Sequence, residues 1–486
     1  MMLPASAFHG IFSCVAHFCS SAKLSSVFSK VNNRHSDRSK AERRNLLQTE
    51  RQIRDFSAAL RFARNDVPFY HVSLCLCALV AIFANSAGAQ RIATLHVTTK
   101  GTENYAIPMQ TNLDAITLLP DSVLRLQEIS AGKKQSVPFQ IETTANARIL
   151  NWLVSPSKQK VRTFELVKGK NAEAKPAMHA GLNDGELILS NGTNPLLHYV
   201  YKTVYPPQGI DTNYKRSGFI HPLLTPHGQT LTWVQPKDHY HHYGLWNPWT
   251  HVLFEKDTLD FWNLKDKKGT VRFAGFGGIY SGDVFSGFTT LHEHVAFKKD
   301  GTQKIAINEL QTVKTYSAGN NSNYYFMDVS IELSCASESP VKLLEYRYGG
   351  IGIRATELWN KDNSMTLTSE GKDRKAADGS TARWCLTQGR LGNDYGGLVM
   401  MSYPANYNHP EPLRVWPENS NKRGDVFLNF SPTKNKDWLL EPGKSYLLKY
   451  RFLIFNDKIG KNESEEAWQS FAKPPVVRVL NNEGTK

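Results

Sequence analysis

From residue 90 onward, hydrophobic and polar residues alternate with a period of two in many short runs. Runs of this kind occupy residues 92–99, 106–109, 115–119, 139–142, 164–167, 186–190, 196–201, 271–273, 291–297, 304–310, 324–333, 342–348, 398–401 and 446–455. Successive side chains of a strand point to opposite faces, so this pattern predicts strands, and the Gly, Asn and Pro residues between the runs predict turns. Helical periodicity is scarce, and residues 464–472 fit it best.

Many strands and few helices predict an all-β protein. We expect a small N-terminal antiparallel β-domain over residues 90–185, followed by a large antiparallel β-sandwich over residues 186–480. The number and length of the later strands resemble the galactose-mutarotase type of supersandwich, in which a concave sheet binds sugars. Such an analogy concerns the fold alone.

Residues 1–89 lack the alternating pattern that predicts strands in the rest of the chain. An apolar run from residue 72 ends in the small residues 87–89, Ala-Gly-Ala, which is typical of a signal peptide. We therefore interpret residues 67–89 as a signal peptide and residues 1–66 as a disordered segment produced by a start codon assigned too far upstream. The alternative is a membrane anchor with a basic tail, although the run is short for a bilayer span. The expected location is periplasmic or secreted, after cleavage near Ala89.

Composition narrows the expected partners. Without residues 1–89, which hold 11 basic and 5 acidic residues, the formal net charge falls from +14 to +8. This excess forms no basic stripe or nucleic-acid motif, so we expect no nucleic-acid partner. Beyond residue 90 no apolar run has the length of a membrane span, so we expect no stable membrane insertion of the mature chain. Cys335 and Cys385 could form one disulfide in an oxidising compartment.

Candidate functional side chains are concentrated in residues 236–249, whose sequence is PKDHYHHYGLWNPW. The two prolines and Gly244 favour a loop, and only a bent loop could bring His239, His241 and His242 together. Imidazoles near neutral pH act as general acids or bases, and the neutral ring binds metals. Individual members could instead cap a turn or pack against a neighbouring tryptophan.

Other residues are weaker candidates. His292 and His294 share one face of a predicted strand, where they could bind a metal or simply face solvent. Arg354 could bind a substrate carboxylate such as that of a uronic acid, or form a salt bridge with Glu345 or Glu357. Asp394 and Glu345 are the carboxylates that we offer as partners of the three histidines.

Several motifs together resemble a bacterial family of otherwise unknown function that is labelled methane oxygenase PmoA-like. They are residues 219–223 (FIHPL), 225–228 (TPHG), 238–246 (DHYHHYGLW), 260–263 (DFWN), 349–354 (GGIGIR), 394–397 (DYGG) and 404–406 (PAN), with His409, Pro410 and Arg414. The resemblance covers about the last three hundred residues. It implies a secreted β-protein that occurs among carbohydrate-degrading genes.

This resemblance also marks residues for a site. We expect His239, His241, His242, Arg354 and Asp394 to be catalytic. The residues expected to contact substrate are His221, Trp246, Trp262, Asn406 and Arg414. Two departures qualify the match: Tyr243 stands where the family usually has arginine, and residues 406–416 match only loosely.

Three functional hypotheses follow. The first is an exported enzyme acting on carbohydrate as a hydrolase, lyase or epimerase, with the histidines transferring protons and Arg354 positioning an anionic group. The second keeps the site but makes His239, His241 and His242 ligands of a divalent metal. The third is a non-catalytic glycan-binding module in which Trp246, Trp249 and Trp262 form a stacking platform.

Overall fold

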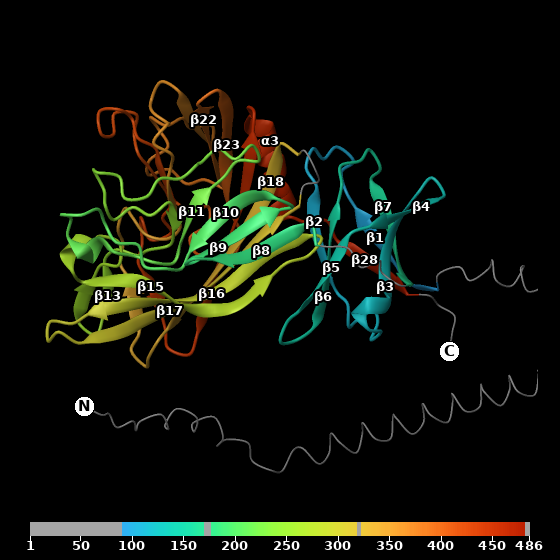
Figure 1. Ribbon diagram of the computed structural model, residues 1–486, viewed down its shortest axis with the longest axis horizontal. Coiled ribbons are helices and arrows are strands. Elements are labelled where there is room, and N and C mark those ends of the chain that lie inside the picture. The colour runs from blue at the N-terminus through green and yellow to red at the C-terminus, as the bar shows by residue number, and fades with distance from the viewer. Residues whose placement is uncertain (1–89, 170–175, 318–321, 482–486) are drawn as a thin grey trace, which may run out of the picture. The chain divides into compact units, whose positions relative to one another are not determined.

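The computed structural model describes residues 90–169, 176–317 and 322–481, and Figure 1 shows their arrangement. The expected signal peptide and the segment before it lie outside these residues. The described chain is almost entirely β-structure, and every strand pairing in it is antiparallel. The all-β prediction is therefore confirmed.

Two small sheets pack together near the N-terminal end of the described chain. The five-stranded sheet has the order β28-β1-β7-β3-β4, with bounds β1 Arg91–Thr98, β3 Leu124–Ser130, β4 Lys133–Val137, β7 Val161–Lys168 and β28 Val477–Asn481. The three-stranded sheet has the order β2-β6-β5, with bounds β2 Ile107–Asn112, β5 Phe139–Thr143 and β6 Arg148–Val154. Their shared core includes Leu95, Trp152 and Phe164. Strand β28 comes from the C-terminal end of the chain, so both ends of the described chain meet in one sheet.

The remaining strands are dominated by two eight-stranded sheets. The first has the order β24-β25-β20-β12-β11-β10-β9-β8, with bounds β8 Met178–Asn183, β9 Glu186–Asn191, β10 Asn194–Val200, β11 Phe219–Leu223, β12 Leu245–Trp246, β20 Gly352–Arg354, β24 Leu413–Val415 and β25 Phe427–Phe430. The second has the order β15-β16-β17-β18-β27-β23-β22-β21, with bounds β15 Gly269–Tyr280, β16 Phe285–Phe297, β17 Gln303–Tyr316, β18 Tyr324–Cys335, β21 Ser364–Thr368, β22 Trp384–Leu391, β23 Asp394–Ser402 and β27 Ser445–Asn456.

These two sheets form the sandwich, and alternation along the strands explains why. In β18, Met327, Val329, Ile331 and Leu333 are buried in the core between the sheets, together with residues of β10 and β11. Phe326 points to the opposite face of the same sheet, where the only α-helix of the described chain, α3 (Lys461–Ala472), covers it. The helix therefore buries the second face of this sheet at Phe326, whereas the rest of that face of β18 is partly exposed.

Smaller elements complete the structure. A four-stranded sheet has the order β14-β13-β19-β26, with bounds β13 Val252–Phe254, β14 Asp257–Leu259, β19 Val341–Leu343 and β26 Trp438–Leu440. Three short 3-10 turns are η1 Asp121–Val123, η2 Thr212–Tyr214 and η3 Leu264–Asp266. Helix α3 begins at Lys461, three residues before the predicted helix, and ends where it was expected.

Two predicted strands are wrong or too long. Residues 115–119 form turns, because the side chain of Asn112 accepts a hydrogen bond from Ala115 N (3.2 Å) and Leu113 O accepts one from Ile116 N (2.9 Å). These local bonds satisfy backbone groups that a strand would have paired. The strand predicted over residues 342–348 stops at Leu343. Cys335 and Cys385 are both free thiols, so the disulfide that they could form is absent from this structure.

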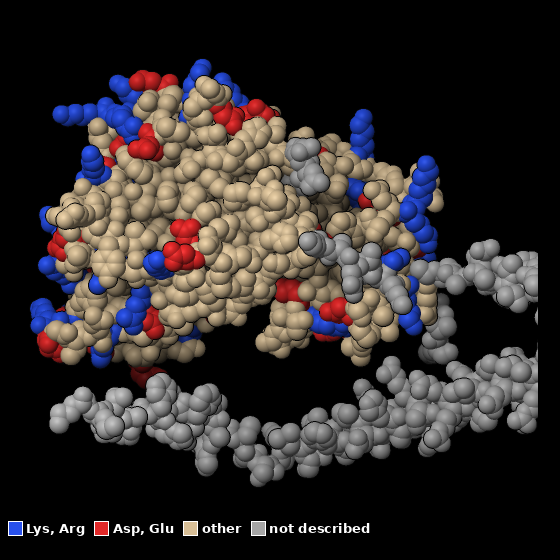
Figure 2. Space-filling model, in the orientation of Figure 1, with Lys and Arg blue, Asp and Glu red and all other residues tan. Residues whose placement is uncertain are grey.

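The surface carries mixed charge. On the face shown in Figure 2, Lys and Arg side chains are interspersed with Asp and Glu around the rim, and no continuous basic band crosses that face. Among the described residues, no helix has the length and apolar character needed to cross a bilayer.

Candidate functional site

The histidine-rich segment is a loop between β11 and β12 that folds into two consecutive turns. The backbone N–H of His239 donates to Pro236 O (2.9 Å), and that of His242 donates to His239 O (3.0 Å). Gln235 N donates to His242 O (2.8 Å) and closes the base of the loop. The prediction of a bent loop is confirmed, and the bend is what gathers the imidazoles.

Gly244 ends this loop and lets the chain enter β12. Its φ is +60°, a left-handed value that favours glycine, and a Cβ atom there would collide with the carbonyl oxygen of Ile220 in β11. A side chain at this position would therefore disturb both the turn and the pairing of β11 with β12.

The histidine triad, defined as His239, His241 and His242, brings three ring nitrogens together. One ligand atom from each residue lies within 4.8 Å of the others, and no other cluster of three or more His, Cys, Asp or Glu side chains in the described chain has such spacing. Nδ1 of His242 is buried and has no hydrogen-bond partner among the described residues. Nitrogens that converge without protein partners can bind a metal ion.

The triad is largely neutral. Burial lowers the pKa of His241 to about 3 and lowers the pKa of His242 well below its ordinary value of 6.5. The charges of the neighbouring histidines act in the same direction. Metal ions bind the neutral imidazole, so burial here favours the form that can act as a ligand.

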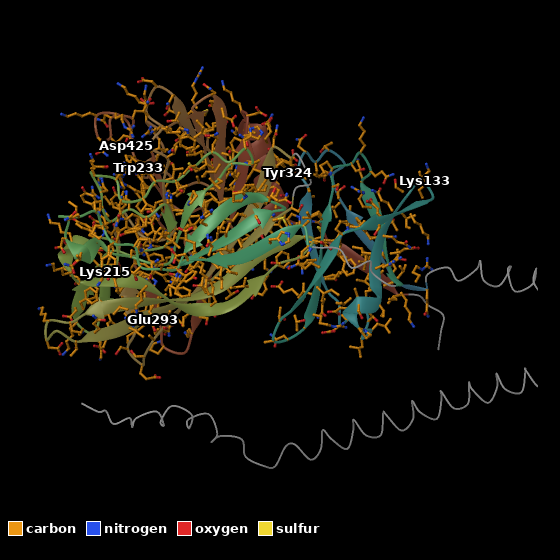
Figure 3. The ribbon with its side chains drawn as sticks, in the orientation of Figure 1. Lys133, Lys215, Trp233, Glu293, Tyr324 and Asp425 are labelled. Atoms are coloured by element: carbon orange, nitrogen blue, oxygen red, sulfur yellow. The ribbon has the colours of Figure 1, made fainter. Side chains whose placement is uncertain are left out.

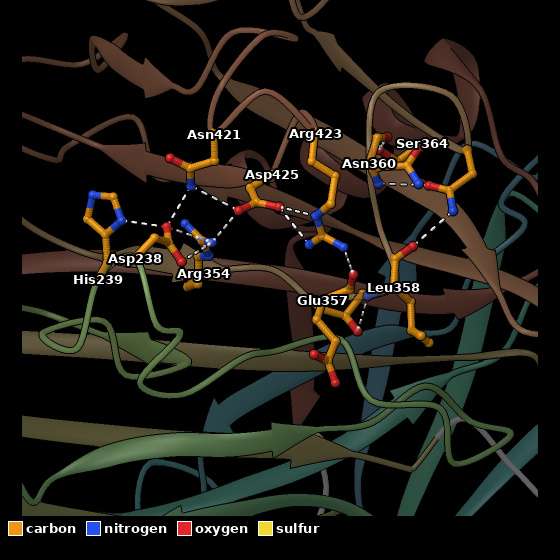
Figure 4. Close-up of polar contacts among 12 residues, drawn as sticks. Asp238, His239, Arg354, Glu357, Leu358, Asn360, Ser364, Asn421, Arg423 and Asp425 are labelled. Atoms are coloured by element: carbon orange, nitrogen blue, oxygen red, sulfur yellow. Dashed lines mark hydrogen bonds and ion pairs between the residues drawn. The ribbon is translucent and has the colours of Figure 1, made fainter. Parts of the chain in front are cut away.

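Asp238 lies beside the triad and is the centre of a polar network, which Figure 4 shows. Its Oδ2 is 2.6 Å from His239 Nδ1, 2.5 Å from Asn421 Nδ2 and 3.2 Å from Arg354 Nη2. Burial would raise the pKa of Asp238, but the His239 hydrogen bond and the Arg354 charge lower it to about 2. Asp238 is therefore an ionised acceptor near neutral pH.

Arg354 is the last residue of β20 and its side chain is fully buried. Its Nη2 donates to Asp425 Oδ2 (2.8 Å) as well as to Asp238. The guanidinium carbon lies 5.0 Å from the ring centroid of Trp233 and 4.7 Å from that of Trp416. Figure 3 shows Trp233 and Asp425 in the same part of the structure. Protein groups thus already occupy one end and both faces of the guanidinium.

The sequence-based expectations for Arg354 need a correction. Neither Glu345 nor Glu357 is its salt-bridge partner. The guanidinium of Arg354 instead binds Asp238 of the histidine loop and Asp425, which lies just before β25. The contact with a substrate anion stays a prediction, but Nη2 is not available for it in this structure.

Aromatic side chains form a wall behind the triad. The His242 ring lies 5.3 Å from Trp246, 5.5 Å from Trp416 and 5.3 Å from Phe427, measured between ring centroids. Trp416 also lies 4.8 Å from the His239 ring. The wall desolvates one side of the triad, which is the physical cause of the low pKa of His242.

The tryptophans proposed as a stacking platform belong to the interior. Trp246, Trp249 and Trp262 are 2%, 0% and 2% exposed. Trp246 and Trp262 pack on each other with ring centroids 5.3 Å apart. None of the three presents a ring face to solvent.

Tyr243 stands where the resembling family usually has arginine. Its side chain is buried, its hydroxyl donates to the carbonyl of Tyr214, and Gln235 Nε2 donates to the same hydroxyl (2.7 Å). Burial raises the pKa of Tyr243 to about 12, so it stays protonated. Tyr243 therefore ties the loop to the preceding segment.

Two further predicted site residues have other partners. Asp394 Oδ2 is 3.0 Å from His227 Nδ1 and accepts a hydrogen bond from Asn456 Nδ2 (2.9 Å). The structure therefore does not pair Asp394 with the triad. His221 Nδ1 is 2.9 Å from Thr232 Oγ1, and burial lowers the pKa of His221 to about 4.

Asn406 and Arg414, both expected to contact substrate, are occupied by protein groups. Asn406 Nδ2 donates to Lys449 O (2.9 Å), and Asn406 Oδ1 accepts from Lys449 N (2.8 Å). Arg414 donates through Nη1 to Asp378 (2.7 Å) and through Nη2 to the Tyr348 hydroxyl (3.1 Å). Both side chains hold local structure together in this structure.

The buried histidine pair, His292 and His294, lies in the interior of the sandwich on β16. His292 Nδ1 is 3.0 Å from Glu309 Oε1, and His294 Nε2 is 2.8 Å from Glu309 Oε2. Asn247 Nδ2 (2.8 Å) and Gln311 Nε2 (3.4 Å) also donate to this carboxylate. The shared face predicted for the two histidines is confirmed, whereas the solvent-facing alternative is wrong.

Glu309 explains the arrangement of this pair. Burial opposes its ionisation, but the hydrogen bonds from His292 and His294 lower the pKa of Glu309 below its ordinary value. The Tyr199 hydroxyl lies 2.6 Å from His292 Nε2, so both nitrogens of that ring have protein partners. Burial also lowers the pKa of His294, and both rings of the pair are held by the one carboxylate of Glu309.

Comparison with known proteins gives a family and no function. A model of a family of unknown function, DUF6807, matches residues 187–469, and the chain belongs to that family. No curated protein matches the chain. The matched region contains both histidine clusters and the whole of the Asp238 network.

Proposed function

We propose that this protein is an exported metal-dependent enzyme that acts on carbohydrate, with the histidine triad as the metal-binding site. The observation that carries the metal assignment is the convergence of three imidazoles, two of which burial keeps neutral, whose ligand atoms lie within 4.8 Å of one another. Three histidines are the donor set of catalytic zinc sites and also suit copper, iron and nickel. A set of three protein ligands leaves a coordination position for water or substrate.

The surroundings of the triad support a catalytic role for such a metal. A bound metal of this kind supplies an activated water or polarises a substrate oxygen. The aromatic wall of Trp246, Trp416 and Phe427 keeps solvent from one side of the triad. The side chain of His239 is 29% exposed, so the site is open to a ligand on the other side.

The carbohydrate and export parts of the proposal rest on the sequence. They follow from the signal-peptide pattern before Gln90 and from the resemblance to the PmoA-like group. Oxygen chemistry, as that label suggests, would require copper or iron at the triad, whereas zinc would direct the reaction toward hydrolysis or elimination. The metal identity therefore decides between these reaction classes.

The test is the metal content of the purified protein, prepared without chelator, beside the variants His241→Ala and His227→Ala. We expect stoichiometric metal in the wild type and in the His227 control, which removes a half-exposed histidine outside the triad. The His241 variant should contain none. A wild-type protein that stays metal-free after loading with zinc, copper and iron would contradict the proposal, as would metal retained by the His241 variant.

A second candidate is metal-free acid–base catalysis, and the Asp238–His239 pair favours it. The Nδ1 atom of His239 is held by a carboxylate, which leaves Nε2 free to accept a proton from a substrate. Turnover of a polysaccharide that survives chelation but is lost in His239→Ala would favour this candidate over the metal-dependent one.

A further inference from the structure

We infer that Asp238 is the positioning residue of the metal site, which fixes His239 as an Nε2 ligand, and that Arg354 acts through Asp238. This inference deepens the proposed function and rests on it. It assigns Arg354 a role different from the contact with a substrate anion that the sequence suggested.

The first step concerns the proton on His239. Asp238 Oδ2 accepts hydrogen bonds from Asn421 Nδ2 and Arg354 Nη2, and it lies 2.6 Å from His239 Nδ1, so it is the acceptor in that contact as well. Nδ1 must therefore carry the proton, which leaves the lone pair on Nε2. A carboxylate behind a ligating histidine fixes the orientation of the ring and raises its basicity as a ligand.

The second step concerns what holds Asp238 in place. Asp238 Oδ2 accepts a hydrogen bond from Asn421 Nδ2 (2.5 Å) in addition to its contact with His239. Arg354 Nη2 lies 3.2 Å from Oδ2 and 3.4 Å from Oδ1 of the same carboxylate. Asn421 comes from a loop that is 183 residues away in the sequence. The carboxylate therefore joins the histidine loop to a distant segment, and its position is set from two sides.

The third step concerns Arg354 itself. Asp425 accepts from the same Nη2 atom (2.8 Å), and Arg423 in turn binds Asp425 through Nε (2.8 Å), as Figure 4 shows. The indoles of Trp233 and Trp416 lie over the guanidinium. A side chain fixed by a carboxylate and two rings has little freedom to follow a substrate, but it can hold Asp238 rigidly.

The experiment measures the affinity for Zn²⁺ and Co²⁺ by calorimetric titration for the wild type, Asp238→Asn and Asp394→Asn. The second variant is a matched control, because Asp394 pairs with His227 Nδ1 in the same way and its side chain is 25% exposed against 28% for Asp238. We expect Asp238→Asn to bind metal about 10- to 100-fold more weakly, as is usual for loss of such an outer carboxylate. The control should bind as the wild type does.

Two further readouts separate positioning from folding. The visible spectrum of the Co²⁺-loaded protein should change in Asp238→Asn, because it reports the ligand field of the metal, and should stay unchanged in the control. If Asp238→Asn does not fold, Asn421→Ala removes a single donor from the same carboxylate and should weaken binding by less than about tenfold. Wild-type affinity and spectrum in every folded variant at Asp238 and Asn421 would overturn the inference. A wild type that binds no metal would instead overturn the proposed function.

Discussion

The two histidine clusters of this protein differ in how their ring nitrogens are arranged. In the buried pair, His292 and His294 share the carboxylate of Glu309, and the Tyr199 hydroxyl meets the second nitrogen of His292. In the triad, only His239 has a carboxylate partner, and one ligand atom from each of the three rings lies within 4.8 Å of the others. Each cluster keeps one buried nitrogen without a hydrogen-bond partner among the described residues, Nδ1 of His294 in the pair and Nδ1 of His242 in the triad. Proximity of histidines alone therefore does not identify a metal site.

This difference in arrangement is why we propose the triad, and not the buried pair, as the metal site. One unpartnered buried nitrogen is common to both clusters, so it does not separate them, whereas three converging ligand atoms are found in the triad and not in the pair. One ring nitrogen of His292 and one of His294 bind the internal carboxylate of Glu309, which suits a structural role. The triad keeps nitrogens available and lies partly open to solvent, which suits a metal and a substrate.

The largest predicted effect is on stability and concerns Glu309. Replacing it with alanine leaves His292, His294 and Asn247 without their shared acceptor inside the sandwich. We expect the free energy of unfolding to fall by about 3–5 kcal/mol, as for removal of one partner from a buried network. Urea unfolding of the variant measures this loss.

A control for Glu309 lies on the neighbouring strand of the same hairpin, where Glu293 is paired with Asn308. Glu293 binds Arg272 at the surface (2.7 Å), and Glu293→Ala should cost less than about 1 kcal/mol. Equal losses in the two variants would mean that the buried pair has no special structural role. The Glu309 variant should also retain the metal bound by the triad.

A second prediction compares two buried glutamates. Glu309 is kept ionised by histidines, whereas Glu411 is surrounded by the neutral groups Ser402, Asn406 and Tyr450. Burial raises the pKa of Glu411 to about 7 from 4.5. Its contribution to stability is thus complete below pH 4.5 and is lost as the pH rises through about 7, by about 3 kcal/mol in total.

Unfolding measured between pH 4.5 and 8 tests this statement. The wild type should lose stability relative to Glu411→Gln as the pH rises, because glutamine does not titrate. His409, which shares Ser402, has its pKa lowered by burial and so titrates below the upper part of this window. Parallel pH profiles of the two proteins would contradict the assignment.

A third, slightly smaller effect is stabilisation by metal. Metal at about 100 times its Kd should raise the free energy of unfolding of the wild type by about 2.7 kcal/mol, because it binds only the folded triad. Chelator should remove the gain, and His241→Ala should show none of it. The same gain in His241→Ala would mean that the metal stabilises the protein from another site.

Much of the fold follows from the sequence, and the reason is local. Alternation along residues such as 324–333 encodes which face of a strand is buried, and the prolines and Gly244 encode the bend of the histidine loop. The local hydrogen bonds of Asn112 and Leu113 overrode an alternating pattern in residues 115–119, which a strand-based interpretation could not detect.

The partners of the site were harder to predict because they are distant in sequence. Trp416, Asn421 and Asp425 reach the triad and Arg354 only through the pairing of β20 with β25. Glu309 is different, because it lies opposite His292 in the hairpin of β16 and β17. Even so, the register shifts by one residue between His294 and Val295, so counting back from the turn near Gly301 would have placed Asn308 opposite His292.

The most direct test of the account is to locate the metal. Crystals of the protein loaded with zinc and measured at the zinc absorption edge should show an anomalous peak among His239, His241 and His242, and none beside His292, His294 and Glu309. A peak at the buried pair, or no peak at the triad in crystals that contain bound zinc, would contradict the central claim that the three converging histidines, and not the buried pair, form the metal site.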